Sequence, residues 1–176
     1  MDPRVRSHLD SFHGVLSTRA AFRLGLTAND LRTMVAAGDL VRVAHGAYLD
    51  AALLAEVSPE EDHRLRVTAL VLAKGGSVAA SHQSAAVLHG LPVLRHALGP
   101  LRVTHTRSAA NTRSRRTYTV HRYPGKDAFG TVGPVAAVIP ALAVLGTTLL
   151  AGVRSGVMAA DAALRTGLTT REELTT

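Results

Sequence analysis

The start of the chain alternates apolar and polar positions with the period of a helix. Val5, Leu9 and Phe12 recur at that spacing, which predicts a short helix over residues 3–12. His13 and Gly14 interrupt the pattern, so we expect the helix to end there. Its apolar stripe predicts that it packs as the first helix of a domain.

Residues 17–36 predict two further short helices joined by a tight turn. Their apolar side chains recur along the faces on which two crossing helices pack, and these are Ala20, Leu24, Leu26, Leu31 and Met34. Small Ala21 stands where the two backbones would approach, and Gly25 supplies the positive φ that the turn needs. Thr27 and Asp30 have the spacing of a capping box, which would begin the second helix. The stretch has the pattern of a helix-turn-helix.

A β-hairpin is predicted directly after these helices, over residues 39–50. Gly38 would end the preceding helix, and His45 with Gly46 would form the turn of the hairpin. Strand-forming side chains flank that turn: Leu40, Val41, Val43 and Tyr48. Two strands placed after a recognition helix predict a wing.

Beyond the hairpin the pattern is that of a second packing unit. Ser58, Pro59 and Glu61 give a strong helix start, and Ser81 is expected to cap a later helix. The predicted elements are a helix from 58 to 75, a strand at 78–80, a helix at 82–89, strands at 101–105, 117–122 and 133–139, helices at 140–150 and 153–166, and a helix start at 169–174.

These elements predict an α+β protein. We expect a winged helix-turn-helix DNA-binding domain at 1–52 and, after a short linker, a small α/β domain at 57–176. The chain stops inside the element that begins near Thr169, so we expect either that the second domain is truncated at its C-terminus or that this is a natural product whose relatives continue.

The composition of the chain restricts the kinds of partner and chemistry to be expected. The formal charge is +7, with 20 Lys and Arg against 13 Asp and Glu, which favours an acidic partner such as nucleic acid. Cysteine is absent, which excludes disulfides, thiolate chemistry and Cys-type zinc sites and fits a cytoplasmic protein. Glycines and prolines break the apolar region 132–153, so it predicts buried elements and no membrane span.

Short polar and cationic side chains are concentrated where double-stranded DNA would be read. In the helix-turn-helix they are Ser17, Thr18, Arg19, Thr27, Ala28, Asn29, Arg32 and Thr33. Ser17 or Thr18 is also expected to cap the helix that follows it. On the wing they are Arg42 and His45, the latter alternatively a plain turn residue. In the second domain they are Arg107, Arg113, Arg115 and Arg116, on a flexible loop that would contact DNA or an acidic partner protein, or be simply solvated.

Catalytic and metal chemistry have little support. Ser81 and His82 are adjacent, but no acid lies near them in the sequence and Ser81 has a capping role. No two histidines are four residues apart, and no acid cluster suits a nuclease Mg²⁺ site. Phosphate-binding glycine loops are missing as well. We therefore expect no catalytic residues, no metal and no cofactor.

The segments 14–49 and 78–91 together resemble the antitoxin family of type IV toxin–antitoxin systems, of the abortive-infection AbiEi type. Residues 118–122, 133–145 and 161–174 follow in the family's order. The resemblance implies a winged-helix domain, an α/β domain, repression of the protein's own operon and neutralisation of a toxin, usually a nucleotidyltransferase. Members often carry Arg and Asp in the helix after the last strand, where this chain has Leu142 and Gly146. Some relatives add a nuclease-like domain that would begin beyond this chain.

The sequence therefore predicts a non-enzymatic, sequence-specific DNA-binding regulator, an autorepressor resembling a type IV antitoxin. One alternative is a protein–protein module that neutralises a toxin without binding DNA. Another is a non-catalytic fragment of a nuclease-linked protein.

Overall fold

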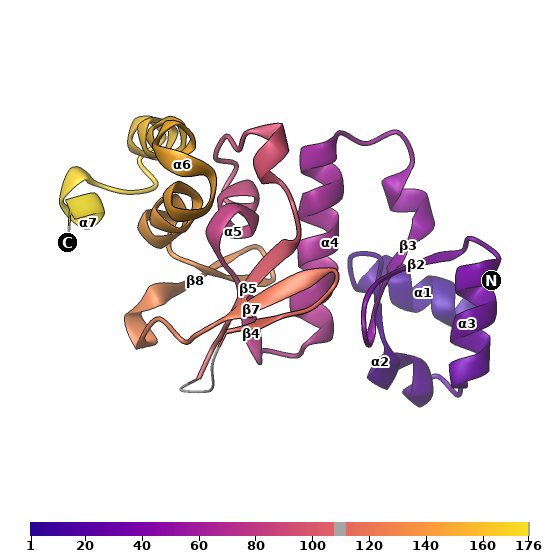
Figure 1. Cartoon of the computed structure of the whole chain (residues 1–176). Helices are drawn as coiled ribbons and strands as arrows, with labels where there is room; N and C mark the ends of the chain where they lie inside the picture. Colours follow the sequence, from indigo (N-terminus) through magenta and orange to yellow (C-terminus); the bar gives the residue numbers. More distant parts are fainter. Residues whose placement is uncertain (108–111, 176) are drawn as a thin grey trace. The chain divides into compact units, whose positions relative to one another are not determined.

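The computed structural model describes residues 1–107 and 112–175. The chain divides into two compact units, Met1–Gly75 and Gly76–Thr176. Both contain helices and a β-sheet, which confirms the α+β class. Figure 1 shows the helices and strands of both units.

The first unit combines helices with a three-stranded antiparallel sheet. Its elements are α1 (Pro3–Ser11), β1 (Val15–Ser17), α2 (Thr18–Arg23), α3 (Ala28–Ala36), β2 (Leu40–Ala44), β3 (Ala47–Asp50), the short 3₁₀ helix η1 (Ala51–Leu54) and α4 (Pro59–Ala73). The strand order is β1-β3-β2, so the strand that precedes α2 pairs with the hairpin that follows α3. Two helices followed by a hairpin on such a sheet have the element order of a winged helix-turn-helix.

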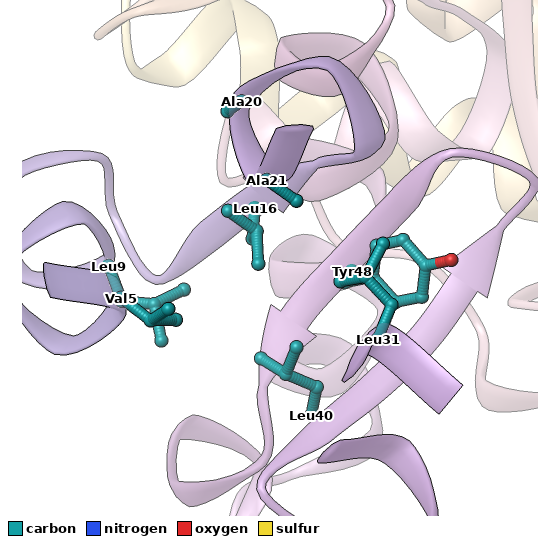
Figure 2. Packing of buried hydrophobic residues seen from close by; sticks show 8 residues of the cluster. All are labelled: Val5, Leu9, Leu16, Ala20, Ala21, Leu31, Leu40 and Tyr48. Atoms are coloured by element: carbon teal, nitrogen blue, oxygen red, sulfur yellow. The ribbon is translucent and has the colours of Figure 1, made fainter. Parts of the chain in front are cut away.

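A single apolar cluster holds these elements together. Val5 and Leu9 of α1 pack with Leu16 of β1, Leu31 of α3 and Leu40 of β2, and all five are at most 2% exposed (Figure 2). Because α1, α2, α3 and the three strands all contribute to this buried cluster, the hydrophobic effect fixes them relative to one another. The stripe predicted for α1 is confirmed except at its end.

Phe12 differs from the sequence prediction. It follows the last residue of α1, is 56% exposed, and stacks on His8 with ring centroids 4.4 Å apart. The helix ends one residue before Phe12, so the ring leaves the face that carries Val5 and Leu9.

Helix α4 belongs to the first unit, whereas the sequence predicted a boundary at residues 52–57. It packs against β1, β2 and β3, and His63, Val67 and Leu70 are buried. The division falls after the helix, at Gly75 and Gly76, both of which have positive φ. The sequence pattern that begins near residue 57 marks the start of a helix. Packing decides which unit that helix joins.

The second unit is a six-stranded mixed sheet with helices. Its elements are β4 (Val78–Ala80), α5 (His82–Leu88), η2 (Arg95–Ala97), β5 (Leu101–His105), β6 (Arg113–Ser114), β7 (Tyr118–His121), η3 (Lys126–Ala128), β8 (Phe129–Val132), β9 (Val135–Val138), α6 (Pro140–Arg165) and α7 (Arg171–Thr175). The strand order is β6-β7-β5-β4-β9-β8. The β4–β9 and β5–β7 pairs are parallel, and the other pairs are antiparallel.

Two strands of this sheet were not predicted. Strand β8 forms an edge by pairing with β9, although residues 129–132 lack a strong strand pattern. Arg113 and Ser114 form β6 within the segment predicted as a flexible loop, pairing with Val120 and Thr119 of β7. Both edges depend on a partner strand for their hydrogen bonds. Residues 108–111 of the predicted loop lie outside the described residues.

Helix α6 consists of two helical stretches that meet at Gly152. This glycine has φ 83° and ψ 168°, a backbone conformation that interrupts a right-handed helix. The sequence predicted two helices here, and the break confirms that prediction. By length and composition α6 is apolar enough to cross a membrane, with 39% of its most apolar window buried. However, neither stretch alone reaches the roughly 20 residues that a spanning helix needs.

Candidate nucleic-acid interface

Two side-chain caps place the helices of the candidate interface. The Ser17 hydroxyl accepts a hydrogen bond from the Ala20 amide at 3.1 Å and begins α2. The Thr27 hydroxyl accepts from the Asp30 amide at 3.2 Å, and the Asp30 carboxylate accepts from the Thr27 amide at 2.7 Å. These bonds from Thr27 lower the pKa of Asp30, so the capping box is held by a charged acceptor. The predicted capping box is therefore present.

The turn between the helices and the end of α3 have the same construction. Gly25, with φ 85°, lets the Leu26 amide donate to the Ala21 carbonyl at 3.0 Å. At the end of α3, Gly38 has φ 79° and the Asp39 amide donates to the Met34 carbonyl at 3.0 Å. Both ends are Schellman-type caps, which require the left-handed conformation that glycine adopts without strain.

Helix α3 presents one face to the core and another to solvent. Leu31 is 2% exposed within the apolar cluster, while Leu24, Leu26 and Met34 are partly buried against it. The residues named from the sequence for DNA contact are exposed on the outer face of α3: Ala28, Asn29, Arg32 and Thr33. The spacing of Asn29 and Arg32 brings their side chains to neighbouring positions on that face.

The wing, meaning β2, β3 and the turn between them, carries the other two predicted residues of this unit. Arg42 lies in β2 and His45 in the turn, and both are exposed. The Arg42 guanidinium lies 3.3 Å from His45 Nδ1, next to a register shift in the strand pair. The Thr18 amide donates to the Gly46 carbonyl at 3.1 Å. The wing turn is therefore tied to the start of α2.

Sequence reasoning missed Lys74 at this site. The residue follows α4, which the sequence assigned to the other domain, yet its ammonium donates to the His45 carbonyl at 3.3 Å. It adds a positive charge beside the wing turn. The contact joins residues 29 positions apart, and no local pattern in the sequence indicates it.

Arginines elsewhere in the first unit are paired with carboxylates. Arg4 contacts Asp2, Arg6 contacts Asp50, and Arg64 contacts Glu61. These contacts raise the pKa of each guanidinium. Four other arginines lie on α2, α3 and the wing, and none of them makes an ion pair among the described residues: Arg19, Arg23, Arg32 and Arg42. Arg23 is exposed in the last turn of α2 and was not among the predicted DNA-contact residues. Burial of the His8 ring, and secondly the charge of Arg23, lower the pKa of His8.

The four arginines predicted for a second contact all belong to the second unit. Arg107, Arg113, Arg115 and Arg116 are exposed. Arg113 is held in β6, and the Arg115 amide donates to the Tyr118 carbonyl at 2.8 Å. The prediction of an unstructured loop is wrong for Arg113, because the edge of the sheet orders its backbone.

Ser81 does not cap α5, which corrects the sequence interpretation. Its side chain makes no capping bond; Ser81 Oγ lies 3.0 Å from His82 Nδ1. His82 has φ 50°, so the chain does not enter the helix in the geometry that places the preceding hydroxyl over the first amides. The groups that act on the pKa of His82 are His121 and Arg102, with no carboxylate. The pair thus has a hydrogen bond but no acid to orient the imidazole. Within the described residues, no group of three His, Asp or Glu side chains gathers for a metal ion.

Residues 4–49 match the model of a family described as transcriptional regulator, AbiEi antitoxin. Residues 4–49 are therefore similar to the AbiEi antitoxin family. The match extends from α1 to β3 and so contains α2, α3 and the wing. No curated protein matches the chain.

The description of the matched family is general. The family is one of transcriptional regulators and antitoxins, which supports a regulator that binds DNA. The matched region includes the DNA-contact residues that the sequence predicted in the first unit, but neither Lys74 nor the arginines of the second unit.

Proposed function

We propose that the first unit binds double-stranded DNA in a sequence-specific manner and represses transcription of the protein's own operon. The observation that carries the proposal is the contrast among its arginines. Arg4, Arg6 and Arg64 are neutralised by carboxylates, while Arg32 and Arg42 on the outer face of α3 and the wing are not. Exposed guanidinium groups without carboxylate partners suit phosphate and guanine contacts.

The outer face of α3 would read bases. Its N-terminal turns would enter the major groove, as in other helix-turn-helix proteins. Asn29 carries an amide that can pair with adenine, and Arg32 can pair bidentately with guanine. Small Ala28 and Thr33 leave room for the groove wall or contact a thymine methyl group.

Phosphate contacts would position this helix. Ser17, Thr18 and Arg19 begin α2, where hydroxyl and guanidinium donors would face one strand. Arg42, His45 and Lys74 surround the wing turn and would contact the backbone or minor groove beside it. The four arginines of the second unit would add a contact that does not depend on sequence.

The test is binding of the full chain to duplex DNA from upstream of its own gene and to a random duplex of equal length. We expect tighter binding to the upstream DNA and an affinity that falls by roughly 0.9 log unit per log unit of salt for each phosphate neutralised. Equal affinity for both duplexes, or an affinity that salt does not change, would refute the proposal. Arg64→Ala is the control for charge, since Arg64 is on α4 and already paired with Glu61.

A second candidate function is neutralisation of a cognate toxin by the second unit. The observation that favours it is the apolar surface of α6, where Leu150, Val153 and Val157 are 44%, 71% and 60% exposed. Co-expression with the product of the neighbouring gene tests it: a stable complex that Val153→Asp disrupts is expected. In both functions the chain acts in the cytoplasm as a binding protein without catalysis.

A further inference from the structure

The second unit contains a pocket of about 150 Å³ that the proposed functions do not use. One wall is apolar and consists of Val138 with Leu142, Leu145 and Leu149 of α6. The base is polar and includes Ser81, His82, Thr104 and His121. An apolar pocket with a few convergent polar groups is the usual form of a small-molecule site.

At the base of this pocket, a buried polar atom has no hydrogen-bond partner among the described residues. The rings of His82 and His121 stack with centroids 3.9 Å apart. His82 Nδ1 is bonded to Ser81 Oγ, and the Thr104 hydroxyl donates to the Arg122 carbonyl at 2.5 Å. His121 Nε2 is buried and has no partner among the described residues. A buried polar atom of this kind calls for a partner in the working protein.

The electrostatic field at the base is positive. Arg122 lines the pocket, and the charge of Arg102 acts on both imidazoles. Neither arginine makes an ion pair within the described residues, and Arg102 Nε is buried without a partner there. Burial, His121 and the charge of Arg102 lower the pKa of His82 to about 4, and burial and Arg102 also lower the pKa of His121. Both rings are therefore mainly neutral at pH 7, and His121 Nε2 can donate a hydrogen bond to a ligand when it carries the ring proton.

We propose that this pocket binds a small carboxylate with an apolar body, such as an aromatic or short branched acid. The carboxylate would lie at the base, where the unpartnered His121 Nε2 and the guanidinium of Arg122 favour an anion, with the charge of Arg102 nearby. The apolar body would lie against the leucines of α6. A pocket near 150 Å³ is of the size that holds a benzene ring. The apolar wall disfavours inorganic phosphate, which is polar on every side.

Titration of the full chain with benzoate tests the proposal, with the histidine ring resonances as the readout. We expect saturable shifts at His82 and His121 and a rise in the pKa of His121, because a bound anion stabilises its protonated form. Benzyl alcohol has the shape without the charge, and acetate has the charge without the body. Each should bind at least about tenfold more weakly than benzoate. Absence of a saturable shift with benzoate, or equal binding of benzyl alcohol, would overturn the proposal.

Two exposed leucines of α6 provide matched variants. Leu149 lines the pocket and is 74% exposed, while Leu150 does not line it and is 44% exposed. Leu149→Glu places a negative charge at the rim and should weaken benzoate binding at least about fivefold, whereas Leu150→Glu should leave it within about twofold. Leu149→Lys should retain binding. If both glutamate variants weaken benzoate equally, or neither does, the site is not where we place it. These measurements need no DNA, so their outcome is independent of the DNA-binding proposal.

Discussion

Gly146 of α6 lies directly against His82 at the start of α5. A β-carbon at position 146 would stand 2.9 Å from the α-carbon of His82 and 2.9 Å from its ring. Real β-carbons do not approach backbone so closely, so the two helices can lie at this distance only because residue 146 has no side chain. This is also the position where the resemblance to the AbiEi family leads one to expect Asp.

Gly146→Ala should therefore destabilise the second unit. In an open helix the same change stabilises by about 1 kcal/mol through helix propensity. Here the contact with His82 should reverse the sign and cost about 1–3 kcal/mol, as overpacking does. Urea unfolding monitored by circular dichroism measures the difference. Gly130→Ala is the control, since nothing lies within 4 Å of the added carbon in β8; a stabilised Gly146→Ala protein would contradict the close contact.

Acidification should destabilise the second unit through His82. Burial, the ring of His121 and the charge of Arg102 lower the pKa of His82 from 6.5 to about 4. Between these two values the unfolded chain binds a proton that the folded chain does not, so stability falls as the pH falls from about 6.5 to 4. The loss should be on the order of 2 kcal/mol, after allowing for solvent screening of the partly exposed ring. Unfolding curves at pH 7 and pH 4.5 would measure it.

A variant isolates the contribution of this histidine. His82→Asn removes the titrating group and should flatten that part of the pH dependence. His96→Asn is the matched control, because His96 is exposed in η2. An unchanged pH profile in His82→Asn would assign the effect to another group.

Arg32 and Leu31 are neighbours on α3 with opposite exposure, so their substitutions should have different effects. Arg32→Ala should cost about 1–3 kcal/mol of binding to the cognate site, much less on random DNA, and leave stability unchanged. Leu31→Ala should cost roughly 2–5 kcal/mol of stability, because Leu31 is 2% exposed in the core. Melting temperatures and fluorescence anisotropy on both duplexes separate the two. A low melting temperature for Arg32→Ala with intact sequence preference would contradict the assignment of the outer face.

The arginines of the second unit should affect affinity without affecting specificity. Replacing Arg113, Arg115 and Arg116 by Ala should leave the fold intact, because all three side chains are exposed. Binding to cognate and random duplexes should weaken by similar factors, and the salt dependence should become shallower, since phosphate contacts carry no sequence information. If the triple variant binds both duplexes as tightly as the parent, these arginines contact something other than DNA.

The sequence by itself determined the features that depend on residues three to five positions apart. The Thr27–Asp30 capping box, the Ser17 cap and the glycine turns at Gly25 and Gly38 were all predicted and are present. The break in α6 at Gly152 is likewise a local feature. Such features follow from local hydrogen bonds and from φ, which the chain specifies wherever it later packs. The outer face of α3 was predictable for a similar reason, because helical period alone separates it from Leu31.

The tertiary structure decided what depends on distant partners. Helix α4 joins the first unit because it packs against β1, β2 and β3, and Lys74 reaches the wing turn only as a result. The edge strands β6 and β8 exist because β7 and β9 pair with them. Ser81 forms no cap, and the residue after it, His82, has positive φ and lies against Gly146, far along the chain. Burial and strand pairing are set by residues brought together from remote positions, and no local pattern records which of them will meet.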